Sequence, residues 1–158
     1  MTDDDGAIMT PLHRLTIVRE RTGTYDARTS TKNSAAVVAI LRPYFATLDR
    51  EHFVALLLDG KNMPIGYNVV SVGTLNASLV HPREVFKAAI IGNAAAIILA
   101  HNHPSGDPTP SAEDHVVTKQ LVDAGVILGI RVLDHVVIGD ADRYYSFCDA
   151  GTMPTAQT

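Results

Sequence analysis

The sequence has a single cysteine, Cys148, in 158 residues, so no disulfide can form within the chain. No unbroken apolar run is longer than seven residues, the length of Ala94 to Ala100, whereas a membrane-spanning helix needs about 20. The N-terminus, MTDDDG, lacks the basic residues that open a secretory signal peptide. These absences exclude a disulfide scaffold and a membrane-spanning helix, and they predict a protein of the reducing cytoplasm.

An excess of basic residues is absent as well. The formal net charge is -4 and the sequence pI is near 5.9, whereas domains that bind nucleic acid through charge alone have a pI above ~9. We therefore expect no strong nucleic-acid binding. The length and the 46% hydrophobic content predict one domain with one core. We assign it to residues 24–152, preceded by a tail or arm at 1–23 and followed by a tail at 153–158.

The apolar periodicity predicts a mixture of helices and strands. Helix patterns cover residues 30–49, 82–91 and 112–124, with Pro43 predicted to kink the first helix and Gly125 to end the third. Strand patterns cover residues 52–59, 64–73, 94–100, 130–138 and 144–149, and the first two are predicted to form a hairpin. This order predicts an α/β (α+β) fold in which helices pack on a mixed β-sheet.

Two of the seven histidines have a spacing with a chemical meaning. His101 and His103 stand at the end of a predicted strand, where residues i and i+2 point to the same side. The turn residues 105–108 then let the chain fold back. Ser111 is a natural N-cap, which places Asp114 in the first turn of the next helix. The spacing therefore brings two imidazoles and one carboxylate to the same loop.

Three protein ligands and one water are the pattern of a catalytic zinc site. Zinc bound in this way lowers the pKa of its water to roughly 7 and so makes hydroxide available at neutral pH. Two histidines and one carboxylate also suit Fe(II), so the residue types leave the identity of the metal open. A Ser-x-x-Asp pattern is also typical of a plain helix cap.

The pattern H-x-H-P, six residues, then S-x-x-D resembles the JAMM motif of MPN/JAB-domain metallopeptidases. The surrounding stretches HNHPSGDPTPSAED, GTLNASLVHPREVFKAAI and LDHVVIGD are similar to the RadC subfamily. The resemblance covers roughly residues 24 to 152. It implies the MPN/JAB (cytidine-deaminase-like) architecture, a mixed sheet flanked by helices.

The resemblance also implies a role for each matching residue. His101, His103 and Asp114 would bind one Zn²⁺ per chain. Ser111 would orient the water or stabilise the developing oxyanion. The family needs an upstream glutamate as general base, and Glu51 fits that position, with Glu84 as the alternative.

The implied activity is the hydrolysis of a peptide or isopeptide bond in a peptide or protein substrate by a zinc-activated water. The alternative is a RadC-type module associated with DNA repair or protein interaction, without peptidase turnover. Asp134 and His135 form a further candidate pair, since a carboxylate often holds the second ring nitrogen of a ligand histidine. Adjacent strand residues point to opposite faces, so only one of the two can face the metal.

Overall fold

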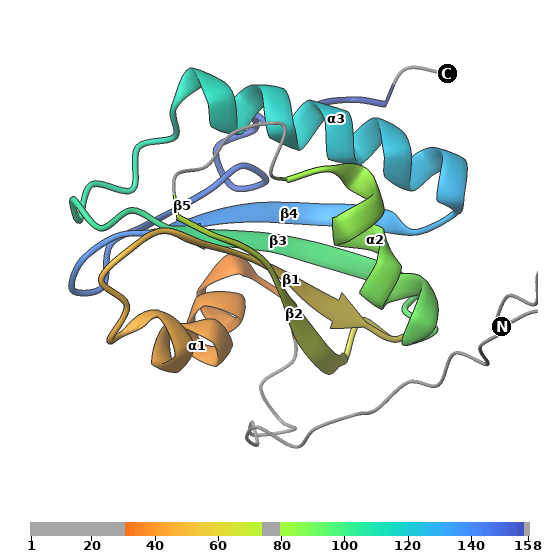
Figure 1. Ribbon diagram of the computed structural model, residues 1–158, viewed down its shortest axis with the longest axis horizontal. Coiled ribbons are helices and arrows are strands. Elements are labelled where there is room, and N and C mark those ends of the chain that lie inside the picture. The colour runs from red at the N-terminus through yellow and green to blue at the C-terminus, as the bar shows by residue number, and fades with distance from the viewer. Residues whose placement is uncertain (1–30, 74–79, 157–158) are drawn as a thin grey trace, which may run out of the picture.

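A five-stranded sheet forms the centre of the computed structural model, which describes residues 31–73 and 80–156 (Figure 1). The predicted arm at 1–23 lies outside these residues. The strands are β1 (His52–Leu58), β2 (Pro64–Val72), β3 (Ala96–Asn102), β4 (Arg131–Ile138) and β5 (Tyr144–Ser146). The helices are α1 (Ser34–Phe45), α2 (Pro82–Ile91) and α3 (Ala112–Leu128). The predicted α+β class with a mixed sheet and flanking helices is confirmed.

The strand order is β2-β1-β3-β4-β5, with β3 in the centre. β1 and β2 form the predicted antiparallel hairpin, and β1 also pairs antiparallel with β3. β3 and β4 are parallel, and α3 connects them. Every residue of β3 is buried, as is usual for a strand that is covered on both faces.

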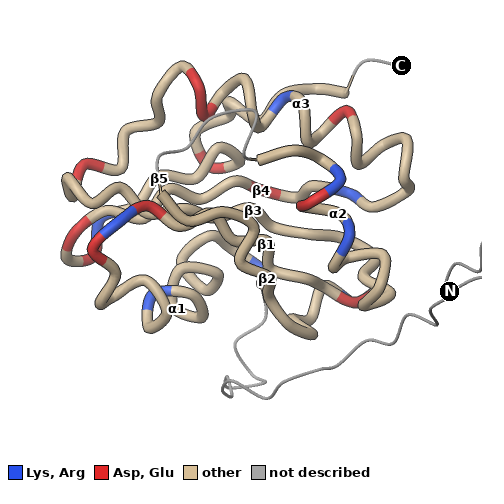
Figure 2. Tube along the Cα trace, in the orientation of Figure 1, with Lys and Arg blue, Asp and Glu red and all other residues tan. Residues whose placement is uncertain are grey.

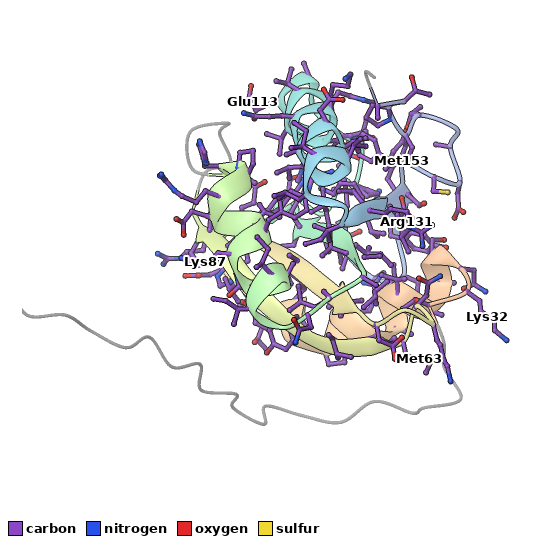
Figure 3. The ribbon with its side chains drawn as sticks, turned by 90° about the vertical axis from the view of Figure 1, so that its right-hand side faces the viewer. Lys32, Met63, Lys87, Glu113, Arg131 and Met153 are labelled. Carbon is purple, nitrogen blue, oxygen red and sulfur yellow. The ribbon has the colours of Figure 1, made fainter. Side chains whose placement is uncertain are left out.

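Alternate residues of the central strands divide the core into two clusters. Phe53 and Leu99 point to the face covered by α2 and α3, where they pack with Phe86 and Leu121. The intervening residues point to the opposite face and pack against α1. In Figure 1, α3 lies above the sheet and α1 below it, and Figure 3 shows the same layers from the side, with side chains filling the space between them. The sheet is therefore the middle layer of the fold, between α1 on one face and α2 and α3 on the other.

Gly125 and Pro43 both lie inside helices. Gly125 does not end α3, which continues to Leu128 and ends at Gly129 in the left-handed conformation. Gly125 is instead a close-packing position, because a Cβ there would lie 2.5 Å from the backbone oxygen of Ile130. Pro43 lies inside α1, which ends two residues later at Phe45. No helix in the described part of the chain is both long enough and apolar enough to cross a membrane.

Candidate metal centre

His101 and His103 lie at the end of β3 and point their imidazoles toward one another. His101 belongs to the strand, and the backbone N–H of His103 donates to the carbonyl of Ile138 at 3.0 Å, which continues the pairing with β4. Their Nε2 atoms are 3.0 Å apart. His101 is fully buried, whereas 18% of the His103 side chain is exposed. The predicted convergence of i and i+2 is therefore present, with one ring at the bottom of the site and the other at its rim.

Asp114 reaches the same point from the first turn of α3, close to Glu113, which Figure 3 labels. Ser111 is the N-cap, as predicted: its Oγ accepts a hydrogen bond from the Asp114 N–H at 3.2 Å. In return, the Ser111 N–H donates to Asp114 Oδ2 at 2.6 Å. Asp114 Oδ1 lies 3.2 Å from His101 Nε2, and Oδ2 lies 3.5 Å from His103 Nε2. The capping box thus fixes the carboxylate in a single orientation.

Glu51 is the fourth residue of the cluster, and it lies directly before β1. Its backbone oxygen accepts from the Gly73 N–H at 2.8 Å, which fixes the chain at this point. Glu51 Oε1 lies 3.8 Å from His101 Nε2. The four side chains offer ligand atoms within 4.8 Å of one another. Glu84, the alternative base, is outside this cluster on α2, where it forms an ion pair with Lys87 at 2.7 Å.

The charges in the cluster interact strongly. Burial alone would raise the pKa of the Asp114 carboxyl. When His101 and His103 carry a hydrogen on Nε2, their hydrogen bonds to this carboxylate outweigh burial and hold the pKa far below its usual range. The hydrogen bond to Asp114 raises the pKa of His103, against the opposing effect of burial. Asp114 therefore remains ionised across the physiological pH range, as a metal ligand must.

A backbone contact sets the protonation of the His103 ring. Its Nδ1 lies 2.7 Å from the carbonyl oxygen of Asp107, which can only accept, so Nδ1 carries the hydrogen. The Asp107 side chain accepts from both the N–H and the hydroxyl of Thr109, which holds this loop in place. In the neutral ring, His103 Nε2 then has a free lone pair that points into the cluster.

A second layer of polar residues lies behind His101. His101 Nδ1 is 2.8 Å from His135 Nε2, and His135 Nδ1 is 2.6 Å from Thr118 Oγ1. Burial, followed by the charge of His101, lowers the pKa of His135 well below its usual value. Thr118 was missed by the sequence reasoning, although it lies one helical turn after Asp114 and so on the same face of α3.

Asp134 points away from the cluster, so His135 is the one residue of the predicted pair that faces His101. The Asp134 carboxylate accepts hydrogen bonds from the Ser146 hydroxyl at 2.6 Å and from the Cys148 N–H at 2.9 Å. Burial raises its pKa. Asp134 thus joins β4 to β5 and to the segment after it, and the nitrogen that faces His101 Nδ1 belongs to His135.

The cluster fits a small divalent cation. Ligand atoms bound tetrahedrally at ~2.1 Å from zinc are ~3.4 Å apart. The measured separations of 3.0, 3.2, 3.5 and 3.8 Å bracket that value. Two imidazole nitrogens and two carboxylates are also ligands that zinc and iron accept. The group could therefore hold a metal ion.

Comparisons with known proteins identify the family of this chain. Residues 31–152 match the RadC-like JAB domain family. A UPF0758 protein of Methanococcoides burtonii is 52% identical over 128 residues, which are 81% of this chain and 56% of that protein. One of Moorella thermoacetica is 59% identical over 114 residues, 72% of this chain and 50% of that protein. The chain thus spans about half the length of these curated relatives. Because the family match covers most of the chain, the protein belongs to the RadC-like JAB domain family.

Proposed function

We propose that this domain is a zinc-dependent hydrolase that cleaves a peptide or isopeptide bond. The observation that carries the proposal is the convergence of ligand atoms from His101, His103, Asp114 and Glu51 within 4.8 Å of one another. The two imidazoles and Asp114 would hold the ion. When bound, zinc would lower the pKa of a water molecule and polarise the substrate carbonyl.

Glu51 is the general base in this proposal. It would accept a proton from the attacking water and return it to the leaving amine nitrogen, so that amide and water become carboxylate and amine. Its partly exposed position suits this role, since 18% of the side chain remains open to solvent beside the cluster.

Ser111 can combine its structural role with one in the reaction. Its Oγ accepts from the Asp114 N–H, which leaves the hydroxyl hydrogen free to donate. Ser111 is exposed at the start of α3, next to the Asp114 carboxylate. We therefore assign to it a hydrogen bond that stabilises the negative oxygen of the reacting carbonyl.

Two hollows border residues of the site. One, of about 390 Å³, is lined by His103, Leu48 and Ile138, among others. The other, of about 370 Å³, is lined by Glu51, Arg50 and Gly73, among others. Pro104 lines both. Open space next to His103 and Glu51 suits a substrate that extends beyond the cleaved bond, which favours an amide of a peptide or protein.

The distribution of charge also favours a protein substrate over nucleic acid. Several basic side chains lie within ion-pair distance of an acidic neighbour, namely those of Arg50, Arg83, Lys87, Lys119 and Arg143. Figure 2 shows red and blue positions interspersed along the trace. Such a surface offers little attraction to phosphates. We place the reaction in the cytoplasm, and we extend the proposal to the longer relatives only for the part that this chain covers.

The identity of the metal is the first test. Protein purified without added metal is analysed by native mass spectrometry and by elemental analysis, next to a His103→Ala variant. The expected result is one zinc per parent chain and less in the variant. Iron in place of zinc, or no metal in either protein, would overturn the zinc assignment.

Hydrolysis is the second test. The zinc-loaded protein is incubated with a pool of internally quenched peptides and with an isopeptide-linked lysine peptide in H₂¹⁸O. We expect cleavage that places one ¹⁸O in the new carboxylate and that is lost in Glu51→Gln. Equal cleavage by the parent and by Glu51→Gln would exclude the assigned base, and a metal-loaded protein that cleaves neither probe would contradict the peptidase assignment.

A further inference from the structure

The buried pair formed by His135 and Thr118 has no role in the reaction described above, yet it contacts two of the proposed ligands. His135 touches the ring of His101, and the hydroxyl of Thr118 donates to the backbone carbonyl of Asp114 at 2.5 Å. All four residues are at most 1% exposed. The chain of contacts His101–His135–Thr118–Asp114 thus joins β3, β4 and α3 behind the cluster.

The hydrogens along this chain can be assigned from Thr118 onward. The Thr118 hydroxyl has one hydrogen, and it donates this hydrogen to the Asp114 carbonyl, which can only accept. Thr118 Oγ1 must therefore accept from His135, so His135 Nδ1 carries a hydrogen. His135 is packed against the rings of Phe53 and Phe147, with the Phe147 ring stacked at 5.0 Å, and a charged ring would be costly in this apolar surrounding. A neutral His135 then has a lone pair on Nε2.

The position of the hydrogen on His101 follows from that on His135. His101 Nδ1 must donate to the lone pair on His135 Nε2, 2.8 Å away. The hydrogen of neutral His101 is then on Nδ1, which leaves the lone pair of Nε2 directed at His103, Asp114 and Glu51. We call this chain of hydrogen bonds, His101–His135–Thr118–Asp114, the relay. Its direction is set at the Asp114 carbonyl, so the residue that supplies the carboxylate also determines which nitrogen of His101 is available to bind a metal ion.

We propose that His135 and Thr118 are positioning residues that hold His101 in the form able to bind metal through Nε2, and that they thereby set the metal affinity of the site. The inference rests on the proposed metal-binding function. It differs from the common arrangement in which a carboxylate holds the ligand histidine. A neutral acceptor pulls less on the Nδ1 hydrogen than a carboxylate does, so His101 would donate less charge to a metal ion bound at Nε2.

Paired variants separate hydrogen bonding from packing. Thr118→Val removes the hydroxyl at nearly equal volume, and Thr118→Ser keeps it. His135→Leu removes the acceptor for His101 Nδ1, and His135→Gln retains a polar acceptor on a chain of similar reach. Removing such an outer partner typically costs about 10- to 100-fold in metal affinity. We expect losses in this range for the Val and Leu variants, and affinities within a few-fold of the parent for Ser and Gln.

The readouts are the zinc affinity, measured by competition with a chromophoric chelator, and the visible absorption spectrum with Co²⁺ bound. A merely structural role for the two residues would lower stability in all four variants without separating Val from Ser. Thermal unfolding of each metal-free protein identifies a variant that fails to fold. Equal zinc affinity in Thr118→Val and Thr118→Ser would overturn the proposal.

Histidine ¹⁵N NMR of the metal-free parent provides a test that needs neither metal nor variant. We expect His135 to be neutral with its hydrogen on Nδ1, and we expect a hydrogen on His101 Nδ1. A hydrogen on His135 Nε2 would overturn the relay. Should the parent bind no metal while these ring states are observed, the proposed function fails and the relay assignment stands, so the two failures can be told apart.

Discussion

The Nε2 atoms of His101 and His103 lie 3.0 Å apart, and in the neutral form of each ring this nitrogen carries no hydrogen. The other nitrogen of each ring already donates, in His101 to His135 and in His103 to the Asp107 carbonyl. Two lone pairs facing each other at this distance repel, and a positive charge between them removes the repulsion. A proton can supply this charge, and so can a metal ion, and the two must compete.

Zinc should therefore stabilise the folded protein. A ligand that binds only the folded state and is present at 100 times its Kd adds about 2.7 kcal/mol to the free energy of unfolding. We expect a gain of this order for the parent, measured by urea unfolding with and without zinc. His103→Ala should lose the gain, whereas His115→Ala, which alters an exposed histidine outside the cluster, should keep it. A zinc-dependent gain that survives in His103→Ala would show that the metal binds elsewhere.

Stability should depend on pH in opposite directions with and without metal. In the metal-free protein Asp114 raises the pKa of His103, so protonated His103 stabilises the fold below pH ~6.5, and this contribution is lost as pH rises through the raised pKa. With zinc bound, protons compete for the same nitrogen, so stabilisation by zinc should grow over that same rise. Unfolding curves between pH 6 and 9, recorded with chelator and with zinc, check both slopes. Parallel slopes would contradict the competition.

Glu51 and Glu84 should respond differently to the same substitution. Glu51→Gln keeps the size of the side chain but removes the proton acceptor, so we expect peptide hydrolysis to fall by about 10²- to 10⁴-fold. Zinc content should remain one per chain. Glu84→Gln should change neither quantity, since Glu84 is ion-paired with Lys87 on the surface of α2. Loss of zinc in Glu51→Gln would instead identify Glu51 as a fourth ligand.

Much of the site follows from local rules that the sequence displays. His101 and His103 converge because the strand repeat is two residues, and Asp114 is placed by the capping box with Ser111. The predicted hairpin and the bounds of α2 also follow from local turn and cap residues. In each case the partners are close in the sequence, so the backbone geometry decides the contact.

Contacts between distant segments could not be predicted in the same way. The hydrogen bond between Thr118 and His135 depends on how deeply α3 packs against β4, which no local pattern specifies. At Gly125 a tertiary contact overrides a local signal. Glycine often ends a helix, but here it lies inside α3, where the missing side chain allows the Ile130 backbone to pack closely. Which member of the pair Asp134 and His135 faces His101 could not be decided for the same reason, and the structure places Asp134 on the far face of β4.

Asp134 should be important for stability and unimportant for metal binding. Its carboxylate accepts from Ser146 and from the Cys148 N–H, and removing a buried acceptor typically costs about 1–3 kcal/mol. We expect Asp134→Ala to lower the free energy of unfolding by about this amount in urea, while the zinc affinity stays within a few-fold of the parent. A drop in affinity as large as that of His135→Leu would show that β4 transmits changes from one face to the other.

The loop that carries His103 packs against the connection between β4 and β5, and Gly139 of that connection lies close to Gly106 and Pro108. A Cβ at Gly139 would lie 2.5 Å from the backbone oxygen of Gly106 and 2.9 Å from Pro108, so one segment must move. Gly106 in turn donates its N–H to the carbonyl of His103 at 2.9 Å. Gly139→Ala should therefore displace the loop and cost about 1–3 kcal/mol of stability.

Because the displaced loop includes His103, the zinc affinity of Gly139→Ala should also fall. Gly60→Ala is the matched control, since a Cβ at Gly60, in the turn between β1 and β2, meets nothing within 4 Å. That variant should unfold and bind zinc as the parent does. Chelator competition and urea unfolding on the three proteins test both effects. Equal zinc affinity in Gly139→Ala and Gly60→Ala would mean that His103 is positioned by its hydrogen bonds to Ile138 and Asp107 alone.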